Sequence, residues 1–245
     1  MRLFKASVAS KPILVLITLL AFAFPVAGQD SRTENGSSCG ILLDNTGSMR
    51  FLMGEVSAVG FALVDHLAAD CKIAIFDHES TRRDGKIYAT VRSDPEWTND
   101  LRRLAQRLEL LRTVGGRTTL FDSIAKVAKS IAKEAGNDDK NERVLVVVTD
   151  GEDRASKIKE KELIEELLAI KVKVFAVALT EELSTDGGLF VSKSPKKKAE
   201  SALRNITKKT GGNVVILSEK DDPKLGDLMK QLFSEIEKEP SKSKK

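Results

Sequence analysis

Short apolar runs alternate with longer amphipathic segments along most of this 245-residue chain. The runs are rich in β-branched residues, which favour strands, and the longer segments carry apolar residues at steps of three and four, which favour helices. One such segment places Leu52, Val56, Val59, Leu63 and Leu67 on the same helical face. Strands are expected over residues 40–43, 72–76, 86–91, 144–148, 172–179 and 214–217, with helices in most of the intervals between them.

This alternation predicts the fold class. Strands that alternate with helices form doubly wound sheets, in which the crossover connections place helices on both faces. The continuous β-branched run at 144–148 is typical of a buried central strand. Residues 86–91 instead alternate, with Ile87, Ala89 and Val91 on one face, as an edge strand would. We therefore expect an α/β protein with a mostly parallel six-stranded sheet, flanked by helices on both faces, whose third strand is antiparallel and lies at the edge.

The first 28 residues differ in character from the rest. Basic residues precede an uncharged apolar run at 13–24, and small residues follow at 26–28, the pattern of an export signal that is cleaved after Gly28. An uncleaved anchor is the alternative, although the run is shorter than the roughly 20 residues that a membrane span needs. We expect a signal peptide over 1–28, a flexible leader over 29–38, one domain over 39–238 and a charged disordered tail over 239–245. The protein would then be secreted or periplasmic, with no stable membrane span after cleavage.

Charge narrows the classes of partner. Removing residues 1–28 lowers Lys plus Arg from 40 to 37 against 36 acidic residues, so the net charge falls from +4 to +1. A nearly neutral chain gives no reason to expect a nucleic-acid ligand or a membrane surface.

The chain has two cysteines, Cys39 and Cys71, and each stands just before or at the start of an expected strand. If these strands are parallel neighbours, their first residues lie side by side, and export places the thiols in an oxidising compartment. A disulfide is therefore possible, and two separately buried thiols are the alternative.

Oxygen-bearing side chains gather at the ends of two expected strands. Asp44, Thr46 and Ser48 alternate through one tight turn after the first strand, and Asp150 follows the buried fourth strand. Thr118, after a Gly-Gly break, offers another hydroxyl. Ligands of doubly wound sheets bind beyond the carboxyl ends of the strands. A set of oxygens without His or Cys suits a hard cation, Mg²⁺ first, with Mn²⁺ or Ca²⁺ possible.

Three segments resemble a known family. ILLDNTGSM, GGRTTLFDSI and VLVVVTDGED are similar to the three segments of the metal-ion-dependent adhesion site in von Willebrand factor type A domains, and among these to small secreted bacterial modules. The resemblance implies a Rossmann-like fold and a divalent metal at Asp44, Thr46, Ser48, Thr118 and Asp150. It also implies a partner protein that completes the site with an Asp or Glu. Thr46 stands where the family more often has Ser, and the choice of Thr118 over Thr119 follows the family pattern.

Other interpretations of the same residues stay open. The two aspartates and the hydroxyls could cap turns. The ion could be purely structural in a scaffold whose contacts do not need metal. A Mg²⁺-dependent phosphotransferase or hydrolase is a third option, but such enzymes need a second carboxylate two residues after the first, where this chain has Thr46. No phosphate-cradling loop is present. We expect no catalytic residues, so the protein would not be an enzyme.

A few other charged residues lie near the same expected strand ends. Residues 77–85 are expected to form a charged connection, in which a lone histidine such as His78 is usually solvated. Asp122 either anchors its loop or stabilises a helix amino terminus. Arg154 could steer an acidic partner, although charged runs are more often simply solvated.

Overall fold

The computed structural model of the protein describes residues 37–92, 95–138, 140–183, 185, 194–217 and 225–233. The expected signal peptide, most of the expected leader and the expected tail lie outside the described residues.

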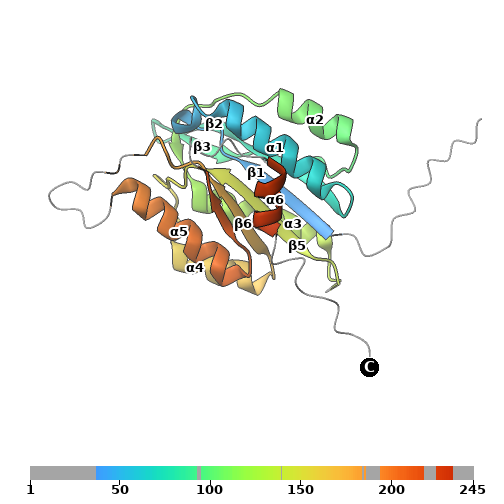
Figure 1. Cartoon of the computed structure of the whole chain (residues 1–245). Coiled ribbons are helices and arrows are strands. Elements are labelled where there is room, and N and C mark those ends of the chain that lie inside the picture. Colours follow the sequence, from blue (N-terminus) through green and yellow to red (C-terminus); the bar gives the residue numbers. More distant parts are fainter. Residues whose placement is uncertain are drawn as a thin grey trace, which may run out of the picture. The chain divides into compact units, whose positions relative to one another are not determined.

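Seven strands form one sheet (Figure 1) in the order β4-β3-β2-β1-β5-β6-β7. The five strands from β2 to β7 in this order are parallel to one another, and β3 is antiparallel to β2. The α/β fold with a mostly parallel sheet is therefore confirmed. The strands are β1 Ser37–Leu43, β2 Cys71–Arg83, β3 Lys86–Val91, β4 Arg117–Thr118, β5 Arg143–Thr149, β6 Lys173–Ala178 and β7 Val214–Ile216.

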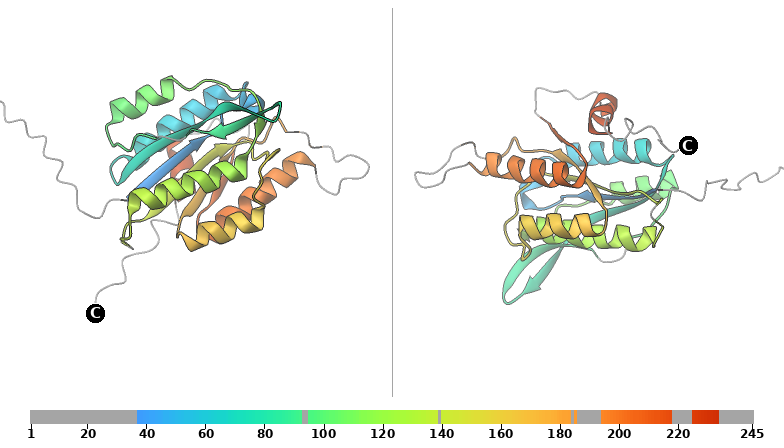
Figure 2. Two further views of the ribbon diagram at one scale, coloured as in Figure 1. Left: turned by 180° about the vertical axis from the view of Figure 1, so that it is seen from behind. Right: turned by 90° about the horizontal axis from the view of Figure 1, so that it is seen from below.

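Helices cover both faces of the sheet (Figures 1 and 2). One apolar cluster joins α1, α2 and α6 to one face, and two further clusters join α3, α4 and α5 to the other. Successive strand residues alternate between the faces, so Ile41 and Leu43 of β1 pack toward α1 while Leu42 packs toward α3. The helices are α1 Met53–Leu67, α2 Leu101–Glu109, α3 Leu120–Ala135, α4 Glu160–Ala169, α5 Pro195–Thr210 and α6 Leu225–Phe233.

The third strand is antiparallel as expected, but its placement at the edge and the count of six strands are wrong. The two-residue strand β4 pairs with Tyr88 and Ala89 on the outer side of β3. Gly116, directly before β4, has φ +124° and approaches β3 so closely that a Cβ there would lie 2.6 Å from the carbonyl carbon of Tyr88. Only glycine fits such a contact. A strand of two residues is too short to leave a pattern in the sequence.

Residues 77–85 are not a loose connection. Strand β2 continues to Arg83 and turns back into β3 through Asp84 and Gly85, which both have positive φ. An Asp-Gly pair is a strong signal for such a two-residue hairpin. The hairpin extends from the body of the domain (Figure 2, right). The outer residues of the hairpin face solvent and are charged for that reason. Their charge therefore did not indicate a loop.

The amino-terminal boundary also differs from the expectation. Strand β1 begins at Ser37, three residues earlier than the predicted start at residue 40. Ser37 pairs with Cys71, and Ser38 pairs with both Lys72 and Arg143. The last two residues of the expected leader 29–38 therefore belong to the sheet.

Within the described residues, no helix combines the length and the apolar character that crossing a bilayer requires.

The disulfide between Cys39 and Cys71 is confirmed. Because β1 and β2 are parallel neighbours, both cysteines lie near the amino ends of their strands, with Cα atoms 5.7 Å apart. The bond closes a loop that spans α1 and ties the first two strands of the chain together.

Replacing both cysteines by alanine should lower the free energy of unfolding by about 3–4 kcal/mol, because a crosslink over 32 residues restricts the unfolded chain. Guanidinium unfolding of the oxidised wild type and of the double variant measures this difference. A loss below about 1 kcal/mol would mean that the unfolded chain retains contacts between these strands without the crosslink.

Candidate functional site

The candidate site lies at the carboxyl ends of β1 and β5, the two central strands. Chain connections leave these strands in opposite directions across the sheet, since β1 leads to β2 on one side and β5 leads to β6 on the other. A crevice forms at such a point in doubly wound sheets. Asp44 directly follows β1 and Asp150 directly follows β5. The amide N–H of Asp44 still donates to the carbonyl of Val148 (2.8 Å), so β5 fixes the position of the Asp44 backbone.

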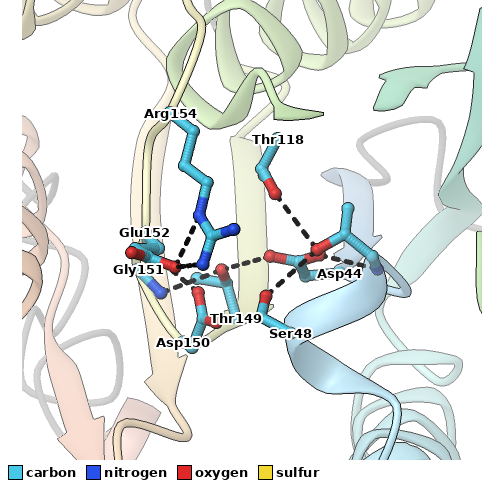
Figure 3. Close-up of polar contacts among 9 residues, drawn as sticks. Asp44, Ser48, Thr118, Thr149, Asp150, Gly151, Glu152 and Arg154 are labelled. Atoms are coloured by element: carbon cyan, nitrogen blue, oxygen red, sulfur yellow. Dashed lines mark hydrogen bonds and ion pairs between the residues drawn. The ribbon is translucent and has the colours of Figure 1, made fainter. Parts of the chain in front are cut away.

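The turn after β1 gathers three oxygen-bearing side chains (Figure 3). The N–H of Thr46 donates to Oδ1 of Asp44 (3.1 Å), which curls the backbone around the carboxylate. A short 3-10 helix over Gly47–Met49 follows and brings the Ser48 hydroxyl to 3.3 Å from that of Thr46. Asp44 and Thr46 are fully buried, and Ser48 is partly exposed. The alternation of oxygen-bearing side chains in the sequence therefore becomes a convergence in space.

Of the two neighbouring threonines, Thr118 is the one directed at this turn. Its hydroxyl donates to the Thr46 hydroxyl (3.1 Å). The hydroxyl of Thr119 instead donates to the carbonyl of Ala89 (2.9 Å) and so holds the start of α3 against β3. Strand β4, although only two residues long, thus sets which threonine faces the site.

Asp150 and its neighbour Thr149 form the third segment of the site. The Thr149 hydroxyl donates to Oδ2 of Asp44 (2.7 Å) and in turn accepts from the N–H of Gly151 (3.0 Å). Oδ1 of Asp150 accepts from the N–H of Glu152 (2.8 Å). Thr149 is fully buried, and no sequence pattern singled it out. Both oxygens of Asp44 therefore have a fixed hydrogen-bond donor and the carboxylate has one orientation.

Asp44 and Asp150 are buried and make no salt bridge among the described residues. Asp150, like Asp44, is almost entirely buried, and burial followed by the charge of Asp44 raises the pKa of Asp150 to about 6. In the described part of the chain, neither carboxylate forms an ion pair with a basic side chain. Two like charges buried together are costly unless a cation joins them.

The donor set fits a hard divalent cation. Two carboxylates and the hydroxyls of Thr46, Ser48 and Thr118 supply oxygen ligands, which Mg²⁺, Mn²⁺ and Ca²⁺ prefer. No group of three or more His, Cys, Asp or Glu that could hold a metal occurs among the described residues. A site in this part of the chain therefore depends on the hydroxyls to complete its ligands.

Asn45 lies between two candidate ligands in the sequence. Its buried side chain links distant segments through hydrogen bonds, a role that the sequence did not reveal. Its Nδ2 donates to the carbonyls of Arg112 (2.6 Å) and His78 (3.2 Å), and its Oδ1 accepts from the N–H of His78 (2.8 Å). Its backbone carbonyl accepts from the N–H of Val114 (2.8 Å). Asn45 therefore joins the Asp44 turn to β2 and to the segment that leads into Thr118.

His78 is fully buried, and the expectation that it is solvated is wrong. Its Nε2 lies 3.1 Å from the Ser123 hydroxyl, and burial lowers the pKa of its imidazole, although the charge of Asp44 opposes this. The neighbouring Asp77 is also buried and pairs with Arg107 and Arg92. These side chains support the site from β2 without joining its ligand set.

The acidic loop after Asp150 is fastened to α3 and β4. The carboxylate of Asp122 accepts from the N–H groups of Lys157 and Ile158, so this residue does anchor a loop. The N–H groups of Arg154 and Ala155 both donate to the carbonyl of Thr118 (3.0 Å). The second and third segments of the site are therefore held together by backbone contacts as well as by side chains.

Comparison with known proteins places the fold in a family. The sequence profile of the von Willebrand factor type A domain matches residues 41–231, most of the chain. None of the curated proteins matches the chain in sequence.

Solved structures with a similar fold include three from bacteria. One is a serine-substituted form of an aerotolerance-related membrane protein from Bacteroides fragilis, at 17% identity and a TM-score of 0.54, covering 83% of this chain and 100% of that chain. The conserved hypothetical protein BatB from Bacteroides thetaiotaomicron is similar at 16% identity and a TM-score of 0.54, with the same coverage. The pilus adhesin SpaC from Lactobacillus rhamnosus GG is similar at 12% identity and a TM-score of 0.52, over 82% of this chain and 31% of that chain. At these identities the likeness concerns the fold alone.

The raised pKa of Asp150 predicts a pH-dependent effect of replacing it. The pKa of the aspartyl carboxyl lies near 3.8 in the unfolded chain and about 6 in the folded one, so ionisation above pH 6 costs the metal-free fold roughly 3 kcal/mol. Asp150→Asn should therefore be more stable than wild type at pH 7.5, and this advantage should vanish near pH 4. Urea unfolding of both metal-free proteins across this range tests it. A stability advantage of Asp150→Asn that does not change with pH would contradict a raised pKa of Asp150 in the folded protein.

The hydrogen bonds of Asn45 predict a second effect on stability, which comes from leaving buried groups without partners. Asn45→Ala leaves the N–H of His78 and two carbonyl groups without their partner, which should cost about 2–4 kcal/mol. Asn141→Ala, which removes one partly exposed hydrogen bond to Ala135, is the matched control and should cost about 1 kcal/mol or less. Thermal or chemical unfolding measures both. Equal losses of unfolding free energy in the two variants would show that the hydrogen bonds of Asn45 do not hold the turn.

Proposed function

Because the chain belongs to the von Willebrand factor type A family over residues 41–231, we propose that it binds a partner protein through a divalent metal. The proposed ligands are Asp44, Thr46, Ser48, Thr118 and Asp150. One observation carries the proposal: two buried carboxylates without a basic partner face three hydroxyls at the carboxyl edge of the sheet. Domains of this family are in general interaction modules rather than enzymes.

The proposed ligand set also suggests what the partner presents. When bound, Mg²⁺, or alternatively Mn²⁺ or Ca²⁺, would keep much of its positive charge, since three of its five protein ligands are neutral hydroxyls. An Asp or Glu side chain of the partner would complete the site. Ser48 is partly exposed while the other four ligands are buried, so the open side of the turn lies at Ser48.

An exposed apolar side chain follows Ser48 closely in the sequence. Phe51 follows Ser48 by three residues and is 71% exposed, with the Arg50 guanidinium 4.4 Å from the centre of its ring. A single exposed aromatic ring is not a site in itself, but aromatic residues are enriched where proteins bind one another. A protein surface, rather than a small metabolite, could contact this ring and the proposed metal together.

We also infer that the protein works outside the cytoplasm, either secreted or in a periplasm. The segment that carries the predicted signal peptide lies outside the described residues. The disulfide between Cys39 and Cys71 supports an oxidising compartment, because such bonds persist there and are rare in a reducing cytosol.

Replacing Asp44 by alanine should lower the Mn²⁺ affinity by at least about 100-fold, since even changes to groups outside a metal's ligands cost 10–100-fold. Partner capture should be lost with it. Isothermal titration with Mn²⁺, and co-purification in Mg²⁺ or in chelator followed by mass spectrometry, measure the two effects. Asp65→Ala removes an exposed carboxylate from α1 and is the matched control, which should behave as wild type.

Two outcomes would contradict the proposal in different ways. If Asp44→Ala or a chelator leaves partner capture unchanged, the domain is a scaffold whose contacts do not need metal. If the wild type binds no Mn²⁺, the carboxylates are only structural elements of the turn.

A further inference from the structure

Arg154 occupies a fixed position beside the proposed metal ligands. Its N–H donates to the carbonyl of Thr118 (3.0 Å), and its own carbonyl accepts from Nη2 of Arg117 (2.8 Å). The backbone at Arg154 is thus attached to β4, which carries one proposed ligand. From there the side chain extends toward the cluster of carboxylates and hydroxyls (Figure 3).

Glu152 orients the guanidinium group. Nε of Arg154 donates to Oε2 of Glu152 (2.8 Å), and Nη2 donates to the same oxygen. The hydrogen bonds and charge of Glu152, and then the charges of Asp150 and Asp44, raise the pKa of Arg154, so the guanidinium lies within the field of both site carboxylates. A planar group held by two bonds to one oxygen has little rotational freedom.

Part of the guanidinium remains available. The Arg154 side chain is 53% exposed, and Nη1 donates to no acceptor among the described residues. An arginine has five N–H donors, of which Glu152 uses two. The group therefore still has N–H donors to offer an incoming anion from the solvent side.

The geometry points to Arg154 as a second anchor for the partner's carboxylate. The proposal rests on the metal-dependent binding proposed above and adds a residue to it. One oxygen of the partner's Asp or Glu would complete the metal site, and the other would accept from Arg154. The planar fork of arginine matches a carboxylate better than a neutral amide, so an Asn or Gln would be a poor substitute.

A different role for Arg154 makes a different prediction. The guanidinium could merely offset the charge of Asp44 and Asp150, without contacting a ligand. In both cases a positive charge beside the proposed metal disfavours cation binding, so its removal should tighten Mn²⁺ affinity. Only an anchoring Arg154 also contributes to carboxylate binding. If Arg154 is an anchor, its removal should therefore raise the affinity for Mn²⁺ and lower the affinity for the carboxylate.

The experiment uses Mn²⁺ and the capped peptide Gly-Gly-Glu-Gly-Gly, whose single charge is its glutamate. Isothermal titration gives the Mn²⁺ affinity, and broadening of the peptide proton resonances by protein-bound Mn²⁺ gives the peptide affinity. In Arg154→Ala the Mn²⁺ dissociation constant should fall about 3–10-fold at low salt. The peptide should bind about 10-fold more weakly.

Two further variants separate the causes. Arg154→Lys keeps the charge and loses the fork, so Mn²⁺ affinity should stay near wild type while peptide affinity falls by a smaller factor than in Arg154→Ala. Arg102→Ala removes a guanidinium that is 97% exposed on α2 and should change neither affinity. Circular dichroism confirms that each variant is folded.

Unchanged peptide affinity in Arg154→Ala would overturn the inference and leave Arg154 as a charge-balancing residue. Weaker binding of both Mn²⁺ and peptide would overturn it too, because that result indicates damage to the loop. If Asp44→Ala abolishes the peptide broadening while Arg154→Ala does not affect it, the proposed function survives and the role of Arg154 fails. If wild type gives no Mn²⁺-dependent broadening, both fail together.

Discussion

The hydrogen bond from Thr149 to Asp44 is the contact on which the candidate site depends. It joins residues 105 positions apart in the sequence, at the ends of the two central strands. Because the bond fixes one carboxylate oxygen and the N–H of Thr46 fixes the other, Asp44 is held in place with its charge buried. Asp150 stands beside it at the same depth. The stability of the sheet therefore offsets the cost of keeping two carboxylates out of water, and that cost favours a cation between them.

The remaining parts of the site are held by backbone contacts to structures that are themselves short. Thr118 belongs to a two-residue strand, and that strand is kept in place by the close approach of Gly116 to β3, by Asn45 through the segment that precedes it, and by the loop at Arg154. None of these pieces would be stable alone. Their mutual bonds make the three segments one cooperative unit, so a change in any one of them should affect the others.

The parallel core and the candidate ligands of the first turn could be expected from the sequence for the same reason: both follow from patterns within a few residues. The run at 144–148 and the alternation of Asp44, Thr46 and Ser48 are local features. Thr149 and Asn45 escaped notice, and His78 was wrongly expected to be solvated, because their partners are distant in sequence and their burial depends on the assembled sheet. The two-residue β4 is too short for a periodic pattern. The extension of β2 into the hairpin was missed because its residues are charged, although the Asp-Gly turn was a usable signal.

The disulfide and the candidate site lie at opposite ends of β1, and this has a mechanical consequence. A load applied to the amino-terminal side of the chain, and opposed by a partner held near Asp44, would act along β1. The strand is hydrogen-bonded on both sides, to β2 and to β5, so the bonds of both ladders would share the load in shear rather than open one after another. Cys39 would pass part of the tension to β2 at the second residue after Ser37. The domain is thus braced along the axis on which a tethered binding module would be pulled.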